Sequence, residues 1–244
     1  MKIGFTGVPP QNIIQEHQKL YPTCEWIDLD VPRPDVQKKD AVDHIPETTC
    51  SVIQTILVNS LSIEPDIIIA SIGEGKCDPM SFLIPIIKRS LPNTKVFEVA
   101  NNDNVDHGVE ISTSDMPLID KFELITSSVV KQNKNIPLIY CKPQAGFWGV
   151  PPYDFSILKL FPNNTHVFGW TRCMENKTPN NIELELYVED NTPTVFYSQS
   201  FCAKNILAKE LARKHKGLYV EVDGLIDNST KEKIKAFLEL KNCF

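Results

Sequence analysis

Short apolar segments alternate with amphipathic segments over the first 142 residues of the chain. The apolar segments are rich in β-branched side chains, as in the run Ile67-Ile68-Ile69. Such runs are typical of strands that are covered on both faces of a parallel sheet. The pattern predicts strands at residues 2–6, 25–29, 67–70, 95–100 and 136–141.

The segments between these strands have apolar residues three and four positions apart, which predicts helices with one buried face. The first helix follows the turn Gly7-Val8-Pro9-Pro10, and the second begins near Pro46. The third begins at Asp78, where an acid followed by a proline favours a helix start. Pro85 falls inside this third helix, so a kink or a later start is expected there. A fourth helix is predicted at residues 114–130.

Strands that are joined by helices run parallel, because the crossover connection is right-handed and long. We therefore expect the predicted strands to end at one common edge. In open sheets of this kind, ligands bind at the carboxyl ends of the strands, near the point where the strand order reverses. The candidate loops at this edge are Gly7–Pro9, Gly73–Asp78, Asn101–His107 and Lys142–Trp148.

Beyond residue 150 the pattern changes, which predicts a parallel α/β domain at 1–150 and an α+β extension at 151–244. Residues 182–188 alternate apolar and polar side chains, which predicts an antiparallel strand, and 194–197 is its expected hairpin partner. A helix at 200–214, a strand at 218–222 and a helix at 229–240 complete the chain. The predicted fold is a three-layer α/β fold, Rossmann-like or phosphorylase/hydrolase-like, with a mostly parallel sheet and a C-terminal hairpin–helix extension.

Composition limits the classes of partner. A formal net charge of -6 over 244 residues repels phosphate backbones and anionic lipids, so we expect no nucleic acid or membrane partner. No basic-then-apolar leader and no long apolar run is present, which predicts a cytoplasmic protein. The seven cysteines form no C-x-x-C pair, so neither a disulfide framework nor a metal site is predicted. The pattern names no cofactor.

The loop after the third strand contains Gly73, Gly75, Lys76 and Asp78. Its spacing does not fit a P-loop, because Cys77 stands where the metal-binding hydroxyl would be. Backbone N–H groups in a glycine turn next to one cation suit a carboxylate or a single phosphate. The alternative is that the glycines only allow the tight turn out of the strand. A small polar or anionic molecule is therefore the expected ligand.

The loop after the fourth strand has the densest group of polar side chains, including Asn101, Asp103 and His107. A histidine near a carboxylate titrates close to neutrality and suits acid–base chemistry. Asparagine and aspartate are also the usual residues of a solvated turn, and this alternative stays open. Lys142, after the fifth predicted strand, is a further candidate for binding substrate.

Cys202 is predicted at the second position of a helix that Ser200 caps, with Lys204 beside it. The positive end of a helix stabilises a thiolate, so Cys202 is a candidate nucleophile. The alternative is a small side chain buried in the packing. The same two interpretations apply to Cys77, which precedes a predicted helix.

The order of MKIGFTG, PDIIIASIG, FEVANNDNVDHG and the strand leading to QAG resembles the layout of pyroglutamyl-peptidase-type cysteine peptidases over about the first 170 residues. The resemblance implies an α/β/α fold with a Glu, Cys, His triad. Glu98 stands where the glutamate of the family falls, and His166-Val167 is similar to its His-Val. Phe147–Val150 occupy the place of the nucleophilic cysteine, so Cys202 is the candidate for a displaced nucleophile.

Two functions follow from these patterns. The first is an enzyme for a small molecule, a thiol-dependent hydrolase or transferase, with its site at the carboxyl edge of the sheet and Cys202, His166 and Glu98 as catalytic residues. The second is a non-catalytic binding or assembly protein. In that case Phe147, Trp148 and Tyr153 would form an exposed apolar contact between copies of the chain.

Overall fold

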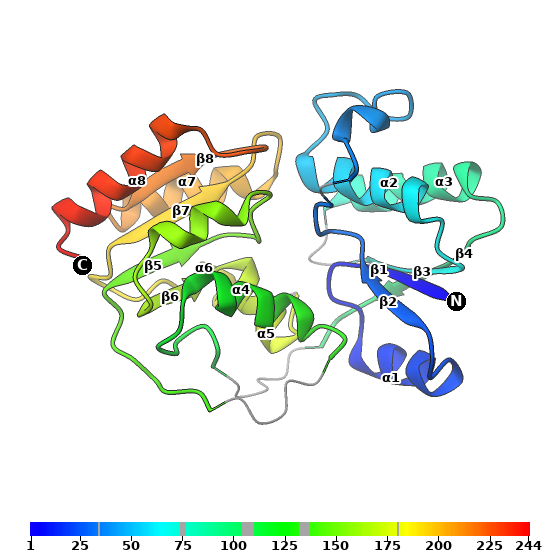
Figure 1. The fold of residues 1–244 in the computed structure, drawn as a ribbon, viewed down its shortest axis with the longest axis horizontal. Coiled ribbons are helices and arrows are strands. Elements are labelled where there is room, and N and C mark those ends of the chain that lie inside the picture. The colour runs from blue at the N-terminus through cyan, green and yellow to red at the C-terminus, as the bar shows by residue number, and fades with distance from the viewer. Residues whose placement is uncertain (34, 74–76, 104–109, 132–136, 180) are drawn as a thin grey trace. The chain divides into compact units, whose positions relative to one another are not determined.

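The computed structural model describes residues 1–33, 35–73, 77–103, 110–131, 137–179 and 181–244 of the chain. They form two compact units, each with its own four-stranded parallel sheet (Figure 1). Unit 1 comprises Met1–Asn104 with Lys177–Asn180, and unit 2 comprises Val105–Asn176 with Asn181–Phe244. The α/β class with parallel sheets is confirmed. The chain divides near residue 104. The change of pattern in the sequence had suggested a division near residue 150.

Unit 1 contains the first four predicted strands, and all of them pair in parallel. Their order in the sheet is β2-β1-β3-β4, so the strand order reverses between β1 and β3. β3 is central and buried, as the run of isoleucines predicted. The strands are β1 (Lys2–Thr6), β2 (Glu25–Asp28), β3 (Ile67–Ile72) and β4 (Lys95–Ala100).

The helices of unit 1 cover the two faces of this sheet unequally. α2 (Ser51–Ile63) and α3 (Asp78–Ser90) pack their apolar faces on one side of the sheet. α1 (Gln11–Leu20) lies on the other side, where the His17 ring packs against Phe97 with 5.5 Å between centroids. α3 begins at Asp78 as predicted and accommodates Pro85 in its interior. α2 begins later than the predicted start at Pro46, and a short 3₁₀ helix, η1 (Lys38–Ala41), precedes it.

Unit 2 contains a second parallel sheet, with the order β6-β5-β7-β8. In chain order this is the same arrangement as in unit 1, since the first strand of each sheet lies between the second and the third. No internal repeat is visible in the sequence, but the topology repeats. The strands are β5 (Ala145–Trp148), β6 (Thr165–Phe168), β7 (Thr194–Ser198) and β8 (Leu218–Glu221).

Helices cover both faces of the second sheet, which gives unit 2 three layers (Figure 1). α4, η2 and α8 bury their apolar side chains against one face. α7 covers the other face, where Trp148, Phe168 and Phe196 form the core. The helices are α4 (Leu118–Ser127), η2 (Phe155–Leu160), α5 (Trp170–Asn176), α6 (Ile182–Leu186), α7 (Lys204–Lys214) and α8 (Asn228–Leu240). Among the described residues, no helix has the length and apolar character needed to span a bilayer.

Three sequence predictions about unit 2 are wrong. Residues 182–186 form the helix α6, because Asn181 caps it by accepting a hydrogen bond from the Leu184 N–H. β7 is therefore not half of a hairpin and pairs in parallel with β5 and β8. The predicted strand at 136–141 makes only one antiparallel bridge in its described part, between Tyr140 and Ser114. The strands consequently belong to two sheets and do not share one carboxyl edge.

The proposed apolar contact surface is also wrong. Phe147 and Trp148 are 0% and 1% exposed, because both lie in the central strand β5. The Trp148 indole N–H donates to the carbonyl of Glu185 at 2.9 Å. Tyr153 is half-buried in the loop after β5. Phe147 and Trp148 belong to the core of unit 2, so these two side chains do not offer an interface between copies of the chain.

Candidate functional site

The described residues of unit 1 that were predicted to bind substrate lie at the carboxyl edge of its sheet. Gly73 follows β3 with a φ of +95°. The Asn101 side chain donates to the Val8 carbonyl at 2.9 Å and accepts from the Asp103 N–H at 2.9 Å. This buried amide therefore ties the loop after β4 to the loop after β1. Asp78 is exposed at the start of α3. The predicted Gly75, Lys76 and His107 lie outside the described residues.

The residues predicted to be catalytic are divided between the two units of the chain. Glu98 lies on β4 of unit 1 and forms an exposed ion pair with Lys88 at 2.6 Å. His166 and Cys202 both belong to unit 2, but to opposite edges of its sheet. His166 is level with Gly146 and thereby with Thr194, the first residue of β7. Cys202 lies beyond Ser198, the last residue of β7. The level of His166, at Thr194, and the end of β7, at Ser198, are four residues or roughly 13 Å apart along the strand.

Cys202 lies in the turn between β7 and α7. The helix begins at Lys204 rather than after Ser200, so Cys202 precedes the first helical turn and is not its second residue. Phe201 beside it has a φ of +58°, a left-handed conformation that is strained for a large side chain. The Lys204 ammonium pairs with Glu185 and lies 5.0 Å from the Trp170 ring. Cys77 has the corresponding position in unit 1, after the third strand and before α3.

The structure brings His166 to a different thiol and a different carboxylate. The Cys141 Sγ lies 4.0 Å from His166 Nε2, and the Cys141 carbonyl oxygen lies 2.8 Å from the same nitrogen. On the other side of the ring, Glu189 Oε2 lies 3.3 Å from Nδ1. We call Cys141, His166 and Glu189 the thiol–imidazole cluster. His166 is 1% exposed, whereas Cys141 is half-buried and can be reached from solvent.

Local backbone contacts hold the two partners of His166 in place. The Cys141 N–H donates to the Thr113 carbonyl at 3.1 Å, and Tyr140 is bridged to Ser114. Glu189 lies at the start of a turn in which its carbonyl accepts from the Thr192 N–H at 3.3 Å. Both segments lie at the amino edge of the second sheet. The cluster is therefore on the opposite edge from the one where the strand pattern predicted a site.

Burial dominates the electrostatics of the cluster. Burial lowers the pKa of His166 and outweighs the carbonyl of Cys141 and the charge of Glu189, which both raise this pKa. Burial also raises the pKa of the Cys141 thiol, against the opposing charge of Lys121. The resting pair at neutral pH is therefore a neutral thiol beside a neutral imidazole. The thiol hydrogen is directed to the Thr113 carbonyl, 3.5 Å from Sγ.

The two neighbours of the His166 ring are both hydrogen-bond acceptors. A neutral ring carries one N–H and satisfies either the Cys141 carbonyl or the Glu189 carboxylate, but not both. An imidazolium carries two N–H groups and satisfies both at once. Accepting a proton therefore converts an unfavourable contact into a hydrogen bond. This gain opposes the lowering of the His166 pKa by burial, which is the larger effect.

Lys121 lies next to this cluster on α4. Its ammonium is fully buried and donates to the carbonyl of Thr165, the residue before His166, at 2.5 Å. Burial lowers the pKa of Lys121 to about 8, and the negative form of Cys141 would oppose this shift. A buried cation beside a thiol favours the thiolate, although burial of the thiol opposes it. Lys142, which was predicted to bind substrate, is exposed beside Cys141.

No protein-family model matches this chain. A comparison with curated proteins gives no match either. Within the described ranges, no group of three or more His, Cys, Asp or Glu side chains has an arrangement that could hold a metal ion. The chemistry of the site is therefore argued from its geometry.

His166 was among the residues predicted from the sequence to be catalytic, whereas its neighbours Cys141 and Glu189 were not. Cys141 fell at the end of a predicted strand, and Glu189 fell in a predicted turn between two strands. A signal for the pair was present, because Cys141 precedes the strand that pairs with the strand of His166. This signal could be used only if β5 and β6 were known to be neighbours in parallel register, and the pattern of apolar residues does not show which strands are neighbours.

Proposed function

We propose that this chain is a thiol-dependent hydrolase or transferase for a small polar molecule. Cys141 is the nucleophile, His166 is the general base, and Glu189 stabilises the imidazolium that forms. The observation that carries the proposal is that the two nitrogens of one ring face these groups: Sγ lies 4.0 Å from Nε2, and a carboxylate oxygen lies 3.3 Å from Nδ1. A nucleophile, a base and a group that orients the base are what covalent acyl transfer requires.

The first half of the reaction would form a thioester. For Nε2 to take the Sγ proton as sulfur attacks an acyl carbon, the proton of His166 must lie on Nδ1, facing Glu189, and Nε2 must give up its contact with the Cys141 carbonyl. The imidazolium then gives this proton to the leaving atom as the bond between acyl group and leaving group breaks. The separation of 4.0 Å is long for proton transfer, but such contacts commonly shorten when substrate is bound.

The second half would restore the thiol. Water, or the hydroxyl or amine of an acceptor, attacks the thioester while His166 removes its proton. When the carbon–sulfur bond breaks, the imidazolium returns a proton to Sγ. Water as the attacking molecule gives hydrolysis, and another acceptor gives transfer.

An activated ester tests this proposal. The wild-type chain is incubated with p-nitrophenyl acetate near pH 7.5, and the release of p-nitrophenol is followed together with peptide mapping by mass spectrometry. We expect a burst of p-nitrophenol and an acetyl group on Cys141. Cys141→Ser should abolish the burst, whereas Cys24→Ser, which removes another half-buried thiol, should preserve it.

The mapping also tests the alternative nucleophiles of the sequence analysis. An acetyl group on Cys202 or Cys77 at a rate that exceeds acetylation of Cys141 would overturn the assignment and favour the carboxyl edge of the sheets. Equal, slow acetylation of all thiols would remove the thiol mechanism altogether.

A further inference from the structure

Exposed aromatic side chains lie beside the thiol–imidazole cluster. Tyr140, next to Cys141 in the chain, is 67% exposed, and its ring centroid lies 5.9 Å from that of His166. Tyr187 is 55% exposed and packs edge-on against Phe168, which in turn contacts His166. We call Tyr140 and Tyr187 the tyrosine rim. Large exposed aromatic side chains next to a buried base are expected to contact whatever reaches the thiol.

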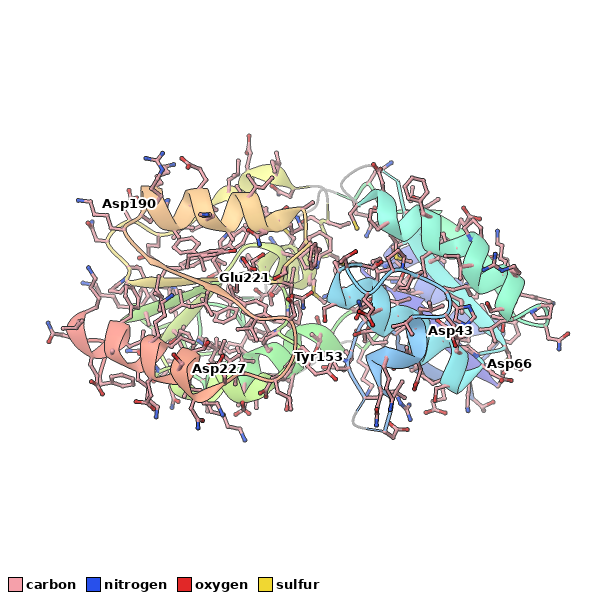
Figure 2. All side chains as sticks on the ribbon, turned by 90° about the horizontal axis from the view of Figure 1, so that it is seen from above. Asp43, Asp66, Tyr153, Asp190, Glu221 and Asp227 are labelled. Carbon is pink, nitrogen blue, oxygen red and sulfur yellow. The ribbon has the colours of Figure 1, made fainter. Side chains whose placement is uncertain are left out.

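The two rim tyrosines and the neighbouring acids are close enough to influence one another. Burial raises the pKa of Tyr187, and the charges of Glu189 and Asp190 and the phenol of Tyr140 raise it further. Asp115 on the other side acts on Cys141 in the same way. Figure 2 shows Asp190 near one end of unit 2 and Glu221 nearer its middle, where Glu221 pairs with Ser198 at the carboxyl end of β7.

Among the described residues near the thiol, the exposed charged side chains are mainly acidic. Asp115 and Asp190 are exposed and Glu189 is partly exposed. Lys142 is the exposed cation next to Cys141, and the Lys121 ammonium is buried on a backbone carbonyl. Negative charge at the approach to a site raises the local concentration of cations. The faces of exposed tyrosine rings attract cations as well.

We propose that the acyl group accepted by Cys141 carries a positive charge, such as an ammonium or quaternary ammonium group a few bonds from the reacting carbonyl. This inference rests on the proposed function and specifies its substrate class. The cation would lie against the tyrosine rim and near Glu189 and Asp190, while the carbonyl carbon faces the sulfur. It departs from the anionic ligand that the glycine turn of unit 1 suggested.

Three p-nitrophenyl esters of matched shape test the charge preference. They are the esters of 4-(trimethylammonio)butanoate, of its neutral isostere 5,5-dimethylhexanoate, and of glutarate, which carries a negative charge. We expect kcat/KM for the cationic ester to exceed that for the neutral one by about tenfold, the sum of two exposed cation–π contacts of about 0.5–1 kcal/mol each. Most of the difference should be in KM and should shrink at high salt. Equal values, or a preference for the anionic ester, would overturn the inference.

Variants of the rim locate the preference. Tyr187→Leu and Asp190→Asn should each lower the ratio of cationic to neutral kcat/KM several-fold. Phe82→Leu, a change at an exposed aromatic residue on α3, should leave the ratio unchanged. An unchanged ratio in both rim variants would place the preference elsewhere and refute the role of the rim.

A binding measurement separates this inference from the proposed function. Cys141→Ala keeps the rim and lacks the nucleophile, so binding of 4-(trimethylammonio)butanamide and 5,5-dimethylhexanamide to it can be followed by NMR. Tighter binding of the cationic amide supports the rim even if Cys141 proves unreactive in the wild-type chain. A reactive Cys141 with equal binding of the two amides would refute the substrate class and leave the thiol mechanism standing.

Discussion

Glu189→Gln is the substitution that isolates the electrostatic part of the cluster. It keeps the length of the side chain and an oxygen near His166 Nδ1, but it removes the negative charge 3.3 Å away. At that distance two unit charges attract by roughly 1 kcal/mol in water and about 5 kcal/mol at an effective dielectric constant of 20. Because the Glu189 side chain is 36% exposed, solvent screens the pair and the lower end applies.

We therefore expect Glu189→Gln to raise the barrier for acetylation of Cys141 by about 1.4 kcal/mol, a tenfold loss of rate. The pKa of His166 should fall further below its usual value, since one of the charges that raises it is gone. Stopped-flow release of p-nitrophenol gives the rate, and the histidine ring signals in an NMR titration give the pKa.

Glu183→Gln is the matched control, because Glu183 is an exposed acid on α6 and is not among the groups that shift the pKa of His166. It should change the acetylation rate by less than about twofold, as expected for an exposed charge without a direct contact. If Glu189→Gln and Glu183→Gln had the same small effect, the carboxylate of Glu189 would not be part of the mechanism.

Three further predictions concern stability. Burial and the neighbouring Asp30 raise the pKa of Asp28 in the folded chain, so the contribution of Asp28 to stability is complete below its pKa in the unfolded chain and is lost as pH rises through its pKa in the folded chain. Asp28→Asn should therefore raise the free energy of unfolding at pH 7 by on the order of 1 kcal/mol and leave it unchanged near pH 3. Urea denaturation at the two pH values measures this difference. Lys121, with its pKa lowered to about 8, binds its proton more weakly in the folded chain, so stability should rise by about 3 kcal/mol between pH 7.5 and 10.5 in the wild type relative to Lys121→Met; parallel curves would contradict this. Phe147→Ala should cost about 3–5 kcal/mol as a large-to-small change in the core, whereas the exposed Phe82→Ala should cost less than about 0.5 kcal/mol; a similar loss in both would refute the burial of β5.

The hydrophobic pattern predicted the elements of unit 1 well, because the apolar periodicity and the turn or helix-start residues indicate the same boundaries there. β3 is an apolar run between turn residues, and α3 begins at an acid followed by a proline. The start of α2 was placed several residues early, since Pro46 suits a turn as well as a first helical position.

The prediction of secondary structure failed in unit 2 where the apolar pattern of a short segment fitted both a strand and a helix. Residues 182–186 alternate like a strand, but the Asn181 cap and the contact of Glu185 with Trp148 and Lys204 favour one and a half turns of helix. The sequence pattern also placed a fifth strand at 136–141 and a loop at 142–148, whereas β5 comprises Ala145–Trp148 and belongs to the second sheet. Which strands pair is decided by contacts between distant segments, and a periodicity does not contain that information.

The candidate site was predicted only in part for the same reason. A thiol, a histidine and a carboxylate were expected, and His166 was correctly buried beside such groups. Glu98 was named from the resemblance to a peptidase family and Cys202 from its place at a predicted helix start, whereas in the structure Cys141 and Glu189 are the thiol and the carboxylate next to His166. Whether Cys202 has a function of its own stays a prediction.

The most direct test of the account is the alkylation rate of Cys141 with and without its base. The wild-type chain, His166→Asn and the control His215→Asn are treated with iodoacetamide between pH 5.5 and 9.5, and the modification of Cys141 is followed by mass spectrometry. If His166 accepts the thiol proton, Cys141 reacts at least several-fold faster near pH 7.5 in the wild type and in His215→Asn than in His166→Asn. An identical rate profile for Cys141 in all three proteins would contradict the proton transfer on which the proposed function depends.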